Sequence, residues 1–548
     1  MPPQAPEPSS PPRRKTWLGA FAHPAFAIAW AASAIALIGI AMYDAASGWL
    51  MTTLDLNPFD VSLVHAATNL PMFLFTLPAG ALADIVDPRR LILAVSCAIA
   101  ALMALFAALV AFQLATPLLL LLTTFLLSSA WALNLPAWLS ILPVLVPKSD
   151  LPEAIAANGV AYNLSRTVGP ALGGLAIVTF GMSTPFWAFA AANLAVIAAL
   201  LWLRTPARET ASLPAERLTS AVRTGVRHAV NNRLLRATLA RTLAVYPFAA
   251  AYWGLLPLIA RQTGTGAEHY GVLLSAISAG AIFGSFGQRF LRGRINLDWM
   301  VVLGTVGTAA ALGLFAFSRD FAVDLGACFC AGTAWVVILA SLYVSAQNVL
   351  PDWVRGRGLA VFLTVVFGTT TVGSAAWGQI AGGVGLGQAL ALSAVGILAG
   401  IPLSWPWKLQ RGEAVDLSPS LHWRRPRAAG DIADDRGPVL VKIEYRIAPK
   451  DRERFLRAMD ELGYERKRDG AFAWGVFEDM GEFGRFEEGY LIESWLDLMH
   501  LRERVTNQDR MLEDEISEML IKPPHIEFLV AAERELLRRR WRDAAAGA

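Results

Sequence analysis

The sequence is poor in charge, in cysteine and in recognisable nucleic-acid features, and each shortage argues against a class of protein. Only 17% of the 548 residues are charged, whereas soluble domains carry about a quarter. The three cysteines lie in apolar runs, which argues against a disulfide framework, and Cys328-x-Cys330 lacks the partners that a zinc site needs. Nucleic-acid binding has no support, because the net charge is only +3 and no cluster alternates basic with aromatic residues.

The scarce charge is distributed unevenly along the chain. Residues 1–430 hold 27 Lys or Arg and 17 Asp or Glu, whereas residues 431–548 hold 20 and 27. Hydrophobic residues make up 55% of the chain, and the mean hydropathy is +0.45. This pattern predicts a membrane protein that carries a soluble domain at its C-terminal end.

Twelve apolar segments are long enough to cross a bilayer, which takes about 20 mostly apolar residues. The first follows three basic residues, as a signal peptide does, but its apolar run continues to about Met51 and is too long for one. We therefore predict twelve transmembrane helices, at Phe26–Met51, Val61–Ala83, Leu91–Phe112, Pro117–Leu145, Ala154–Phe180, Phe186–Leu203, Ala237–Ile259, Tyr270–Phe290, Met300–Phe317, Val323–Val349, Leu359–Ile380 and Gln388–Trp407.

Basic residues sort the connections between these helices into two sides. One side holds nearly all of the Lys and Arg, including eight arginines between Arg204 and Arg241, and the other side holds only Arg261 and Arg319. The positive-inside rule places the basic side in the cytoplasm, together with both termini and the soluble domain. The chain is therefore predicted to be a multi-pass protein of the cytoplasmic (inner) membrane.

The long connection in the middle of the chain predicts a helix of its own. Leu218, Val222, Val226 and Val230 recur at intervals of four, with arginines on the other faces. Such a helix can lie on the inner leaflet or pack on the bundle, and the sequence favours neither. The predicted regions are a disordered tail (1–15), a first six-helix half (16–204), a cytoplasmic middle loop with an amphipathic helix (205–236), a second six-helix half (237–410), a linker (411–437) and a soluble domain with a basic C-terminal helix (438–548).

An internal repeat relates the two halves. An offset of 204 residues pairs Gly80 with Gly284, Arg90 with Arg294, Ala130-Trp131 with Ala334-Trp335, Pro147 with Pro351, Gly169 with Gly373 and Gly174 with Gly378. A Trp, a Pro and an Arg at one shared offset are harder to attribute to chance than the glycines alone. The repeat predicts two pseudo-repeated six-helix halves with a central path where they meet, which is a transporter architecture.

Four sequence motifs resemble those of a known family. Gly80-Ala-Leu-Ala-Asp84-Ile-Val-Asp-Pro-Arg89-Arg90 resembles the cytoplasmic loop signature of the major facilitator superfamily, and Gly169-Pro170-Ala-Leu-Gly173-Gly174 resembles its antiporter motif. Asn163-Leu-Ser-Arg166-Thr-Val and Pro351-Asp352-Trp353-Val-Arg355-Gly-Arg357 resemble the enterobactin-exporter-like branch, also called transmembrane secretion effectors. The resemblance covers nearly the whole chain.

The resemblance implies a conformational role for Gly80, Asp84, Arg89 and Arg90. A carboxylate at the end of one helix can pair with arginines at the start of the next and hold both helices in one state. Snorkelling arginines that serve only topology are the alternative. Ile85 and Pro88 stand where the family usually has basic residues, so we expect the loop to hold one state less tightly.

The resemblance implies a conformational role for a second set: Gly169, Pro170, Gly173, Gly174, Asp352, Arg355 and Arg357. Pro170 removes a helix hydrogen bond and the glycines permit close packing and bending, which suits a hinge between the halves. Ordinary packing of small residues between membrane helices would look the same. The early glycine of the family's antiporter motif is replaced here by Ser165.

Charged and polar residues inside apolar segments are the candidates for the transport path, because burying a charge at mid-bilayer costs roughly 2.5–3.5 kcal/mol. Arg166, beside Asn163, lies near mid-depth and can bind an anionic group or pair with a neighbouring helix. Asp44 lies about 27 Å along the first helix from Phe26, near the outer interface, and is a candidate for proton coupling or cation binding. Weaker candidates are Asn134, His65, Gln347, Asn348 and Gln379.

The C-terminal region alternates strand and helix patterns in the order β-α-β-β-α-β, with a helix predicted at Leu498–Leu520, and this order predicts a soluble α+β ferredoxin-like domain. It resembles the antibiotic-biosynthesis-monooxygenase-like modules, and the resemblance implies a possible homodimer. Trp474, Tyr490, Trp495, His500 and His525 line a pocket or belong to core and edges. Because no nucleophile, metal or cofactor motif is present, an enzymatic role rests on fold analogy alone.

Together these features predict a secondary active transporter, a proton-coupled exporter that works by alternating access, and not an enzyme. No GxxxxGK[ST] motif is present, so a proton gradient is the implied energy source and no bound cofactor is expected. The resemblance implies a siderophore-like or drug-like small-molecule substrate. Two alternatives stay open: a transporter–enzyme fusion that modifies its cargo, and an uptake transporter with a regulatory or dimerising tail.

Overall fold

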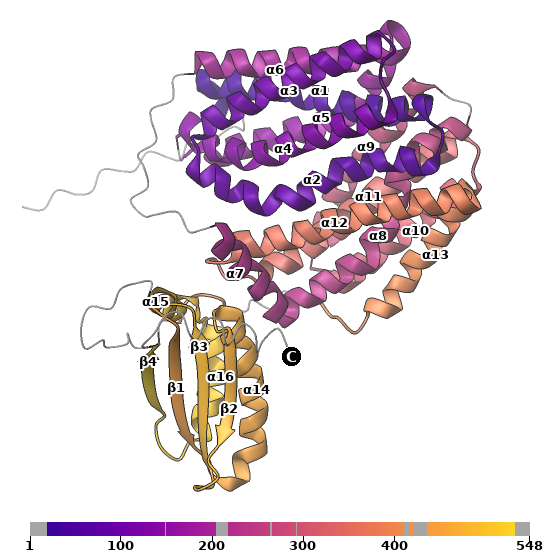
Figure 1. Ribbon diagram of the computed structural model, residues 1–548. Helices are drawn as coiled ribbons and strands as arrows, with labels where there is room; N and C mark the ends of the chain where they lie inside the picture. Colours follow the sequence, from indigo (N-terminus) through magenta and orange to yellow (C-terminus); the bar gives the residue numbers. More distant parts are fainter. Residues whose placement is uncertain are drawn as a thin grey trace, which may run out of the picture.

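The computed structural model describes residues 19–147, 149–203, 218–263, 266–291, 293–409, 416–420, 422–423 and 436–531. The predicted tail (1–15), most of the predicted linker (411–437) and the predicted basic C-terminal helix lie outside the described residues. The described chain forms a bundle of long helices with a smaller sheet-containing domain at one end (Figure 1). We call that end of the bundle the domain-side end and the opposite end the far end.

Twelve long helices form the bundle, as the sequence predicts. They are α1 (Pro24–Leu54), α2 (Pro58–Ile85), α3 (Pro88–Ala111), α4 (Pro117–Leu145), α5 (Leu151–Phe180), α6 (Thr184–Trp202), α8 (Arg233–Gln262), α9 (Ala267–Leu291), α10 (Leu297–Phe317), α11 (Phe321–Asn348), α12 (Arg355–Val384) and α13 (Leu386–Ser404). Within the described part of the chain, ten helices are long and apolar enough to cross a membrane; α2 and α5 are not among these ten. These two carry polar residues such as His65 and Arg166, and both pack against the opposite half.

Local sequence explains where several helices begin. Each of α1 to α4 starts at a proline, whose fixed φ and missing N–H suit the first turn of a helix. The side chains of Asp87, Asn232 and Asn296 accept hydrogen bonds from backbone N–H groups at the starts of α3, α8 and α10. A short 3₁₀ helix, Gly19–Ala22, precedes α1.

The two halves, α1–α6 and α8–α13, contact each other through two equivalent helix pairs. α5 of the first half packs on α9, and α12 of the second half packs on α2. A Cβ on Gly174 would lie 2.9 Å from the Cα of Glu268 at the start of α9, and one on Gly378 would lie 2.9 Å from the carbonyl oxygen of Pro58 at the start of α2. Since Gly174 and Gly378 are partners in the 204-residue repeat, the pseudo-repeat predicted from sequence extends to the packing.

A buried ion pair fixes the domain-side end of the second half. The Arg241 guanidinium on α8 donates to Asp298 on α10 at 2.9 Å, and both side chains are almost completely buried. Arg241 also donates to the carbonyl of Trp407, and Asp298 accepts from the backbone N–H of Leu409, just beyond α13. The exit of the chain from the last membrane helix is therefore anchored to α8 and α10.

The amphipathic helix predicted in the middle loop is α7 (Leu218–Asn231). It packs against α12 and α8 of the second half, against α14 of the soluble domain and, less extensively, against α2. Gly225 lies against Arg357 at the start of α12, where an added Cβ would come within 3.2 Å. Of the two arrangements left open by the sequence, the structure has the helix packed on the bundle.

The soluble domain has the ferredoxin-like order of elements. It consists of β1 (Val439–Arg446), the 3₁₀ turn η2 (Pro449–Asp451), α14 (Arg452–Asp469), β2 (Ala473–Glu478), β3 (Arg485–Ile492), α15 (Trp495–Arg504), α16 (Asn507–Glu518) and β4 (His525–Val530). The sheet is antiparallel with strand order β2-β3-β1-β4, and each β1 residue from Val439 to Ile443 faces partners on both neighbouring strands. One predicted helix, Leu498–Leu520, is in fact two, because Thr506 and Asp509 form a capping box that starts α16.

Candidate functional site

Arg166 lies on the face of α5 that is directed between α1 and α9. Gly169 and Gly173 follow it by three and seven residues, and an added Cβ on either would meet the backbone or side chains of α1. Pro170 and Gly174 follow it by four and eight residues and lie against α9. Because residues at these spacings share a helix face, Arg166 points between a helix of each half, about 21 Å along α5 from its far end.

Asp44 lies on the corresponding face of α1. It follows Ala41, which contacts Gly169 of α5, by three residues, and precedes Gly48, which contacts Pro257 of α8, by four. Asp44 is about 15 Å from the far end of its helix, because α1 continues to Leu54. Its carboxylate and the Arg166 guanidinium are within range of each other's charge. The described residues contain no ion pair between the two, and both side chains are exposed.

His65 brings the second half into the same region. Its ring stacks on Trp253 of α8 at 5.6 Å with an interplanar angle of 3°, so the contact joins α2 to α8 across the two halves. Asn69 holds the imidazole through its amide, 3.1 Å from Nε2. His65 also lies within range of the Arg166 charge. We refer to Asp44, His65, Arg166 and Trp253 as the central site.

Aromatic side chains extend the central site into the second half. Trp335 of α11 packs edge-on against Trp253 at 5.7 Å and against Tyr246 at 4.9 Å. The hydroxyls of Tyr246 and Tyr252 and the indole N–H of Trp253 are buried without a hydrogen-bond partner in the described structure. The first half thus contributes charged groups and the second half contributes aromatic rings with unused donors.

Two predicted path residues are placed differently from Arg166. The amide of Asn163 is exposed and donates to the carbonyl of Gly159 in its own helix at 2.8 Å. Asn134 lies on α4 with a buried side-chain oxygen that has no partner among the described residues. Neither residue contacts the central site through an interaction that the described structure contains.

Large side chains seal the far end between the halves. Trp49 of α1 stacks on Tyr270 of α9 at 6.1 Å, and Arg261 of α8 lies over the Trp49 ring at 5.9 Å. Arg261 also donates to the carbonyl of Thr52. The Trp49–Tyr270 stack is the counterpart of the Trp253–His65 stack, because the 204-residue offset pairs Trp49 with Trp253.

The described part of the loop motif between α2 and α3 makes its hydrogen bonds within the first half. Arg89 donates through Nε and Nη2 to the carbonyl of Leu200 near the end of α6, at 3.0 and 2.7 Å. Arg90 is exposed, and its backbone N–H donates to Asp87. The side chains at Gly80 and Asp84 lie outside the described residues, so a latch through Asp84 stays a prediction.

The glycines of the antiporter motif allow backbone-to-backbone contact. A Cβ on Gly173 would lie 2.9 Å from the carbonyl oxygen of Met42 in α1. Gly271 of α9 faces the carbonyl of Pro170, and an added Cβ there would lie 3.2 Å from the Cα of Ala171. A side chain larger than hydrogen at these positions would force the helices apart. Gly173 therefore determines how closely α5 approaches α1 within the first half, and Gly271 determines how closely α5 and α9 approach across the two halves.

The motif at the start of α12 forms a turn that meets the soluble domain. Asp352 pairs with Arg355 at 2.6 Å, and Arg357 packs beside Gly225 of α7. The ring of Trp353 lies edge-on to His228 of α7 at 5.6 Å and beneath the guanidinium of Arg504 of α15 at 4.8 Å. The resemblance had suggested a gating role for this motif without its contact to the soluble domain.

The interior of the soluble domain is filled by charged and aromatic side chains. Arg466 lies 2.8 Å from Glu513 and 3.3 Å from Glu488, and Tyr445 and Trp474 donate to Glu488. Trp423 of the linker covers Arg466 at 4.7 Å. Burial opposes ionisation of Glu513, but Arg466 and donors from the linker lower its pKa to about 2. Of the predicted pocket residues, Trp474 and Tyr490 belong to this interior, whereas His525 is exposed.

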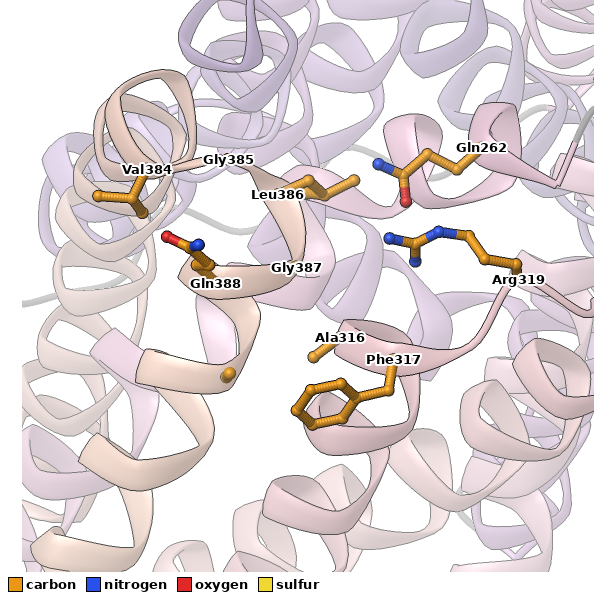
Figure 2. A pocket seen from close by; sticks show the side chains of 10 residues that line it. Gln262, Ala316, Phe317, Arg319, Val384, Gly385, Leu386, Gly387 and Gln388 are labelled. Carbon is orange, nitrogen blue, oxygen red and sulfur yellow. The ribbon is translucent and has the colours of Figure 1, made fainter.

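A pocket of about 390 Å³ lies away from the central site, at the far end of the second half. Figure 2 shows Arg319 and Gln262 near Leu386 and Gly387, with Phe317 below them. The pocket is formed where α8 and α10 end and where α12 passes into α13. It brings together none of the predicted path residues.

The sequence indicates Arg166 and Asp44 as path candidates and His65 as a weaker one, and it did not lead us to Trp253. A signal for Trp253 was present, because the repeat offset pairs it with Trp49. No local pattern announces that a histidine in one half stacks on a tryptophan in the other. That contact depends on how the halves are assembled.

Comparisons with known proteins agree with this architecture. Residues 15–536 match the model of a family described as transmembrane secretion effector. The chain is 26% identical to the multidrug efflux pump Tap of Mycolicibacterium fortuitum over 366 residues, 64% of this chain and 88% of that protein. It is also 26% identical to the enterobactin exporter EntS of Escherichia coli O127:H6 over 339 residues, 61% of this chain and 80% of that protein.

Solved structures show the same fold at low sequence identity. The nucleoside transporter NupG is 13% identical with a TM-score of 0.58, covering 70% of this chain and 99% of its own. A bacterial homologue of the lysosomal transporter Spinster, solved inward-facing and unoccupied, is 12% identical with a TM-score of 0.53, covering 70% and 95%. At such identities the similarity concerns the fold alone.

Proposed function

Because the chain belongs to the transmembrane secretion effector family of the major facilitator superfamily, a family of membrane transporters, we propose that it exports a small amphipathic molecule in exchange for protons. Its curated relatives are efflux pumps, one for several drugs and one for a siderophore. The observation that carries the proposal is the central site, where Asp44 and His65 of the first half lie within range of the Arg166 charge and His65 stacks on Trp253 of the second half.

The composition of the central site suggests the substrate class. Trp253 and Trp335 offer faces and edges for an aromatic group, while Arg166 can bind an acceptor or an anion bidentately. The carboxylate of Asp44 can accept from a phenolic hydroxyl or an ammonium group. A siderophore-like or drug-like molecule with aromatic rings and polar substituents satisfies all three.

Proton exchange follows if the proton and the substrate compete for Asp44. A substrate donor bound to the carboxylate favours its charged form, so binding from the cytoplasm releases a proton. A proton that arrives from outside occupies the same oxygen atoms and releases the substrate there. Rocking of the two halves would expose the central site to each side in turn.

The test is a transport assay in inverted membrane vesicles with an imposed proton gradient. Ethidium and enterobactin represent a drug-like and a siderophore-like substrate. Accumulation that requires the gradient and is lost in Asp44→Asn supports the proposal. Gradient-independent accumulation, or a lower intracellular level of substrate on deleting the gene, supports uptake or another energy source.

We also propose that the domain-side end faces the cytoplasm of the inner membrane. Arg89, Arg90, Arg355 and Arg357 lie at that end, and positive residues favour the cytoplasmic side. Membrane-impermeant thiol reagents applied to intact cells should label a cysteine introduced at Phe317 of the far end. They should not label one introduced at Met480 of the soluble domain.

For the soluble domain we propose a structural role without catalysis, and pairing with a second copy. The charged interior held by Arg466 leaves the space between sheet and helices filled. The open face of the sheet carries Leu440, Leu491 and Leu529 on three neighbouring strands, and Leu529 is half exposed. A mass measurement in detergent should give a dimer that Leu529→Lys converts to a monomer, and purified protein should leave quinone substrates unchanged.

A further inference from the structure

The second half carries a surface that receives the soluble domain. This docking surface consists of α7 and the turn Pro351–Val354 at the start of α12. The soluble domain meets it with the C-terminal end of α14, with Glu493 after β3 and with α15. Figure 1 shows the domain beneath α7, beside the second half of the bundle.

Trp353 is held between the two parts. Its ring is edge-on to His228 on one side and covered by Arg504 on the other, at 5.6 and 4.8 Å. Arg504 is itself anchored, because it donates to the carbonyl of Asp469 at the end of α14 at 3.0 Å. Burial and the neighbouring Arg468 lower the pKa of His228 to about 3, so its ring is neutral and acts as an aromatic partner.

Opposite charges align the same surfaces. Arg223 of α7 donates to Glu493 at 3.1 Å, and Arg227 lies 4.0 Å from the same carboxylate. Both Arg223 and Glu493 are more than a third exposed, so water and salt screen this attraction. These ion pairs therefore orient the soluble domain on the docking surface but contribute little to the strength of the contact.

Unused polar atoms weaken the dock. The Nε of Arg227 and the Nε1 of Trp353 are buried without a hydrogen-bond partner within the part of the chain that the structure describes. Each of them would regain water if the surfaces separated, which lowers the cost of separation. A permanent interface would be expected to satisfy such groups.

The position of α7 connects the dock to the two halves. α7 touches α12 and α8 of the second half and also α2 of the first half. A relative movement of the halves would therefore change the contacts of α7, and the soluble domain packs on this helix.

We infer that the soluble domain is a reversible partner of this docking surface, docked while the far end is sealed and released when the far end opens. The inference rests on the proposed alternating access. In the docked state Trp353 is clamped, and the connection between α11 and α12 is held in the arrangement described here. Release frees that connection to move as the halves rock.

The test uses the full-length protein with Cys97, Cys328 and Cys330 replaced by alanine. Cysteines at Arg223 and Glu493 are bridged by a short reducible bifunctional thiol reagent, which ties the domain to α7. Transport should be lost on bridging and restored by reduction. The matched control bridges Arg454 and Glu515, which lie 2.9 Å apart within the soluble domain, and should transport equally before and after bridging.

A second readout needs no transport. The far end is locked by a bridge between cysteines at Thr52 and Arg261. The yield of the Arg223–Glu493 bridge is then measured in the locked protein and in unlocked protein that is supplied with substrate and a proton gradient. The yield should be highest in the locked protein and should fall in the unlocked one. Equal bridge yields in locked and unlocked protein, or full transport by the bridged protein, overturn the inference. If no tested substrate is exported but the bridge yield still depends on the far-end lock, only the proposed substrate and direction are overturned.

Discussion

The two halves are alike in the aromatic stacks that they make with each other and unlike in their charged groups. Trp49, near the far end, and Trp253, at the central site, are repeat partners, and each stacks across to the other half, on Tyr270 and on His65. At the central site, the repeat partners of Asp44 and Arg166 are Phe248 and Thr370, neither of which is charged. The aromatic contacts between the halves thus follow the repeat, whereas the charges of the central site belong to the first half alone.

The same contrast holds for the groups that fix each half. Arg241 and Asp298 form a buried ion pair in the second half, whereas their repeat partners in the first are Leu37 and Ala94. The second half also carries α7 and the docked domain. It is the half with the additional anchors, which suits a rigid platform against which the first half moves.

The largest expected effect is on the two equivalent contacts between the halves, α5 on α9 and α12 on α2. Valine at Gly174 or at Gly378 would place atoms into the start of α9 or of α2, so we expect both variants to lose transport completely, because overpacking forces the helices apart. Gly159→Val is the matched control, since an added Cβ there meets nothing within 4 Å. Unequal losses in the two glycine variants would contradict the equivalence of the two contacts.

The next effect concerns the ion pair that only the second half has. Asp298→Asn should destabilise the protein by about 3–5 kcal/mol, because it leaves a buried guanidinium without its counterion. The measurement is the thermal midpoint in detergent, with Ala94→Ser at the repeat position of the first half as control. An unchanged midpoint would contradict the role of this pair as an anchor.

The charges of the central site should matter only in the first half. Asp44→Asn and Arg166→Gln are each expected to lower transport about 10- to 100-fold, the equivalent of one charge-assisted hydrogen bond of roughly 1.5–3 kcal/mol. Thr370→Val, at the repeat position of Arg166, should transport normally. Asp44→Asn should also abolish the pH dependence of transport, and a retained dependence would place proton coupling elsewhere.

A smaller effect is expected from the aromatic stacks. His65→Ala should lower transport about 2- to 10-fold, in keeping with the roughly 0.5–1.5 kcal/mol of an aromatic pair, while His65→Phe should retain most of it. Tyr270→Ala should lose a comparable amount, because it removes the counterpart stack. A large loss in His65→Phe would assign the imidazole a chemical role beyond stacking.

The smallest effect concerns the domain that only the second half carries. Burial and Asp509 raise the pKa of Glu465 from 4.5 to about 9. A raised pKa contributes stability that is fully present below pH 4.5 and lost as the pH rises to about 9, so the thermal midpoint of the domain should fall between pH 6 and 9. Glu465→Gln should reduce this fall of the thermal midpoint by a few degrees. The control is Glu515→Gln, at an exposed carboxylate, which should leave the fall unchanged.

The helices were predictable from sequence because each is a long, mostly apolar segment and most of the connections are short and rich in polar residues, Gly or Pro. The predicted and observed bounds of α4, Pro117–Leu145, coincide. Arg166 stands out as a candidate because a lone charge in an apolar segment is conspicuous, and its role stays a prediction. The split between α15 and α16 was missed, because the capping box at Thr506 interrupts an otherwise continuous helical pattern.

The rest of the site required the assembled structure. His65 and Trp253 are 188 positions apart and meet only because the halves face each other. Trp353 belongs to a motif that suggested gating, and its partners His228 and Arg504 lie far away in the chain. Neither contact leaves a periodic or local trace that sequence reasoning could have used.

The anchoring of Leu409 to Asp298 determines how strong the dock needs to be. Asp416, which accepts a hydrogen bond from Asn507 of the soluble domain, follows Leu409 by seven positions, and seven positions span at most about 25 Å. Because the domain is covalently connected to the bundle over so short a distance, its effective concentration at the docking surface is on the order of millimolar. An interface too weak to hold two separate proteins would therefore stay occupied most of the time, and a modest change at its rim would be enough to empty it.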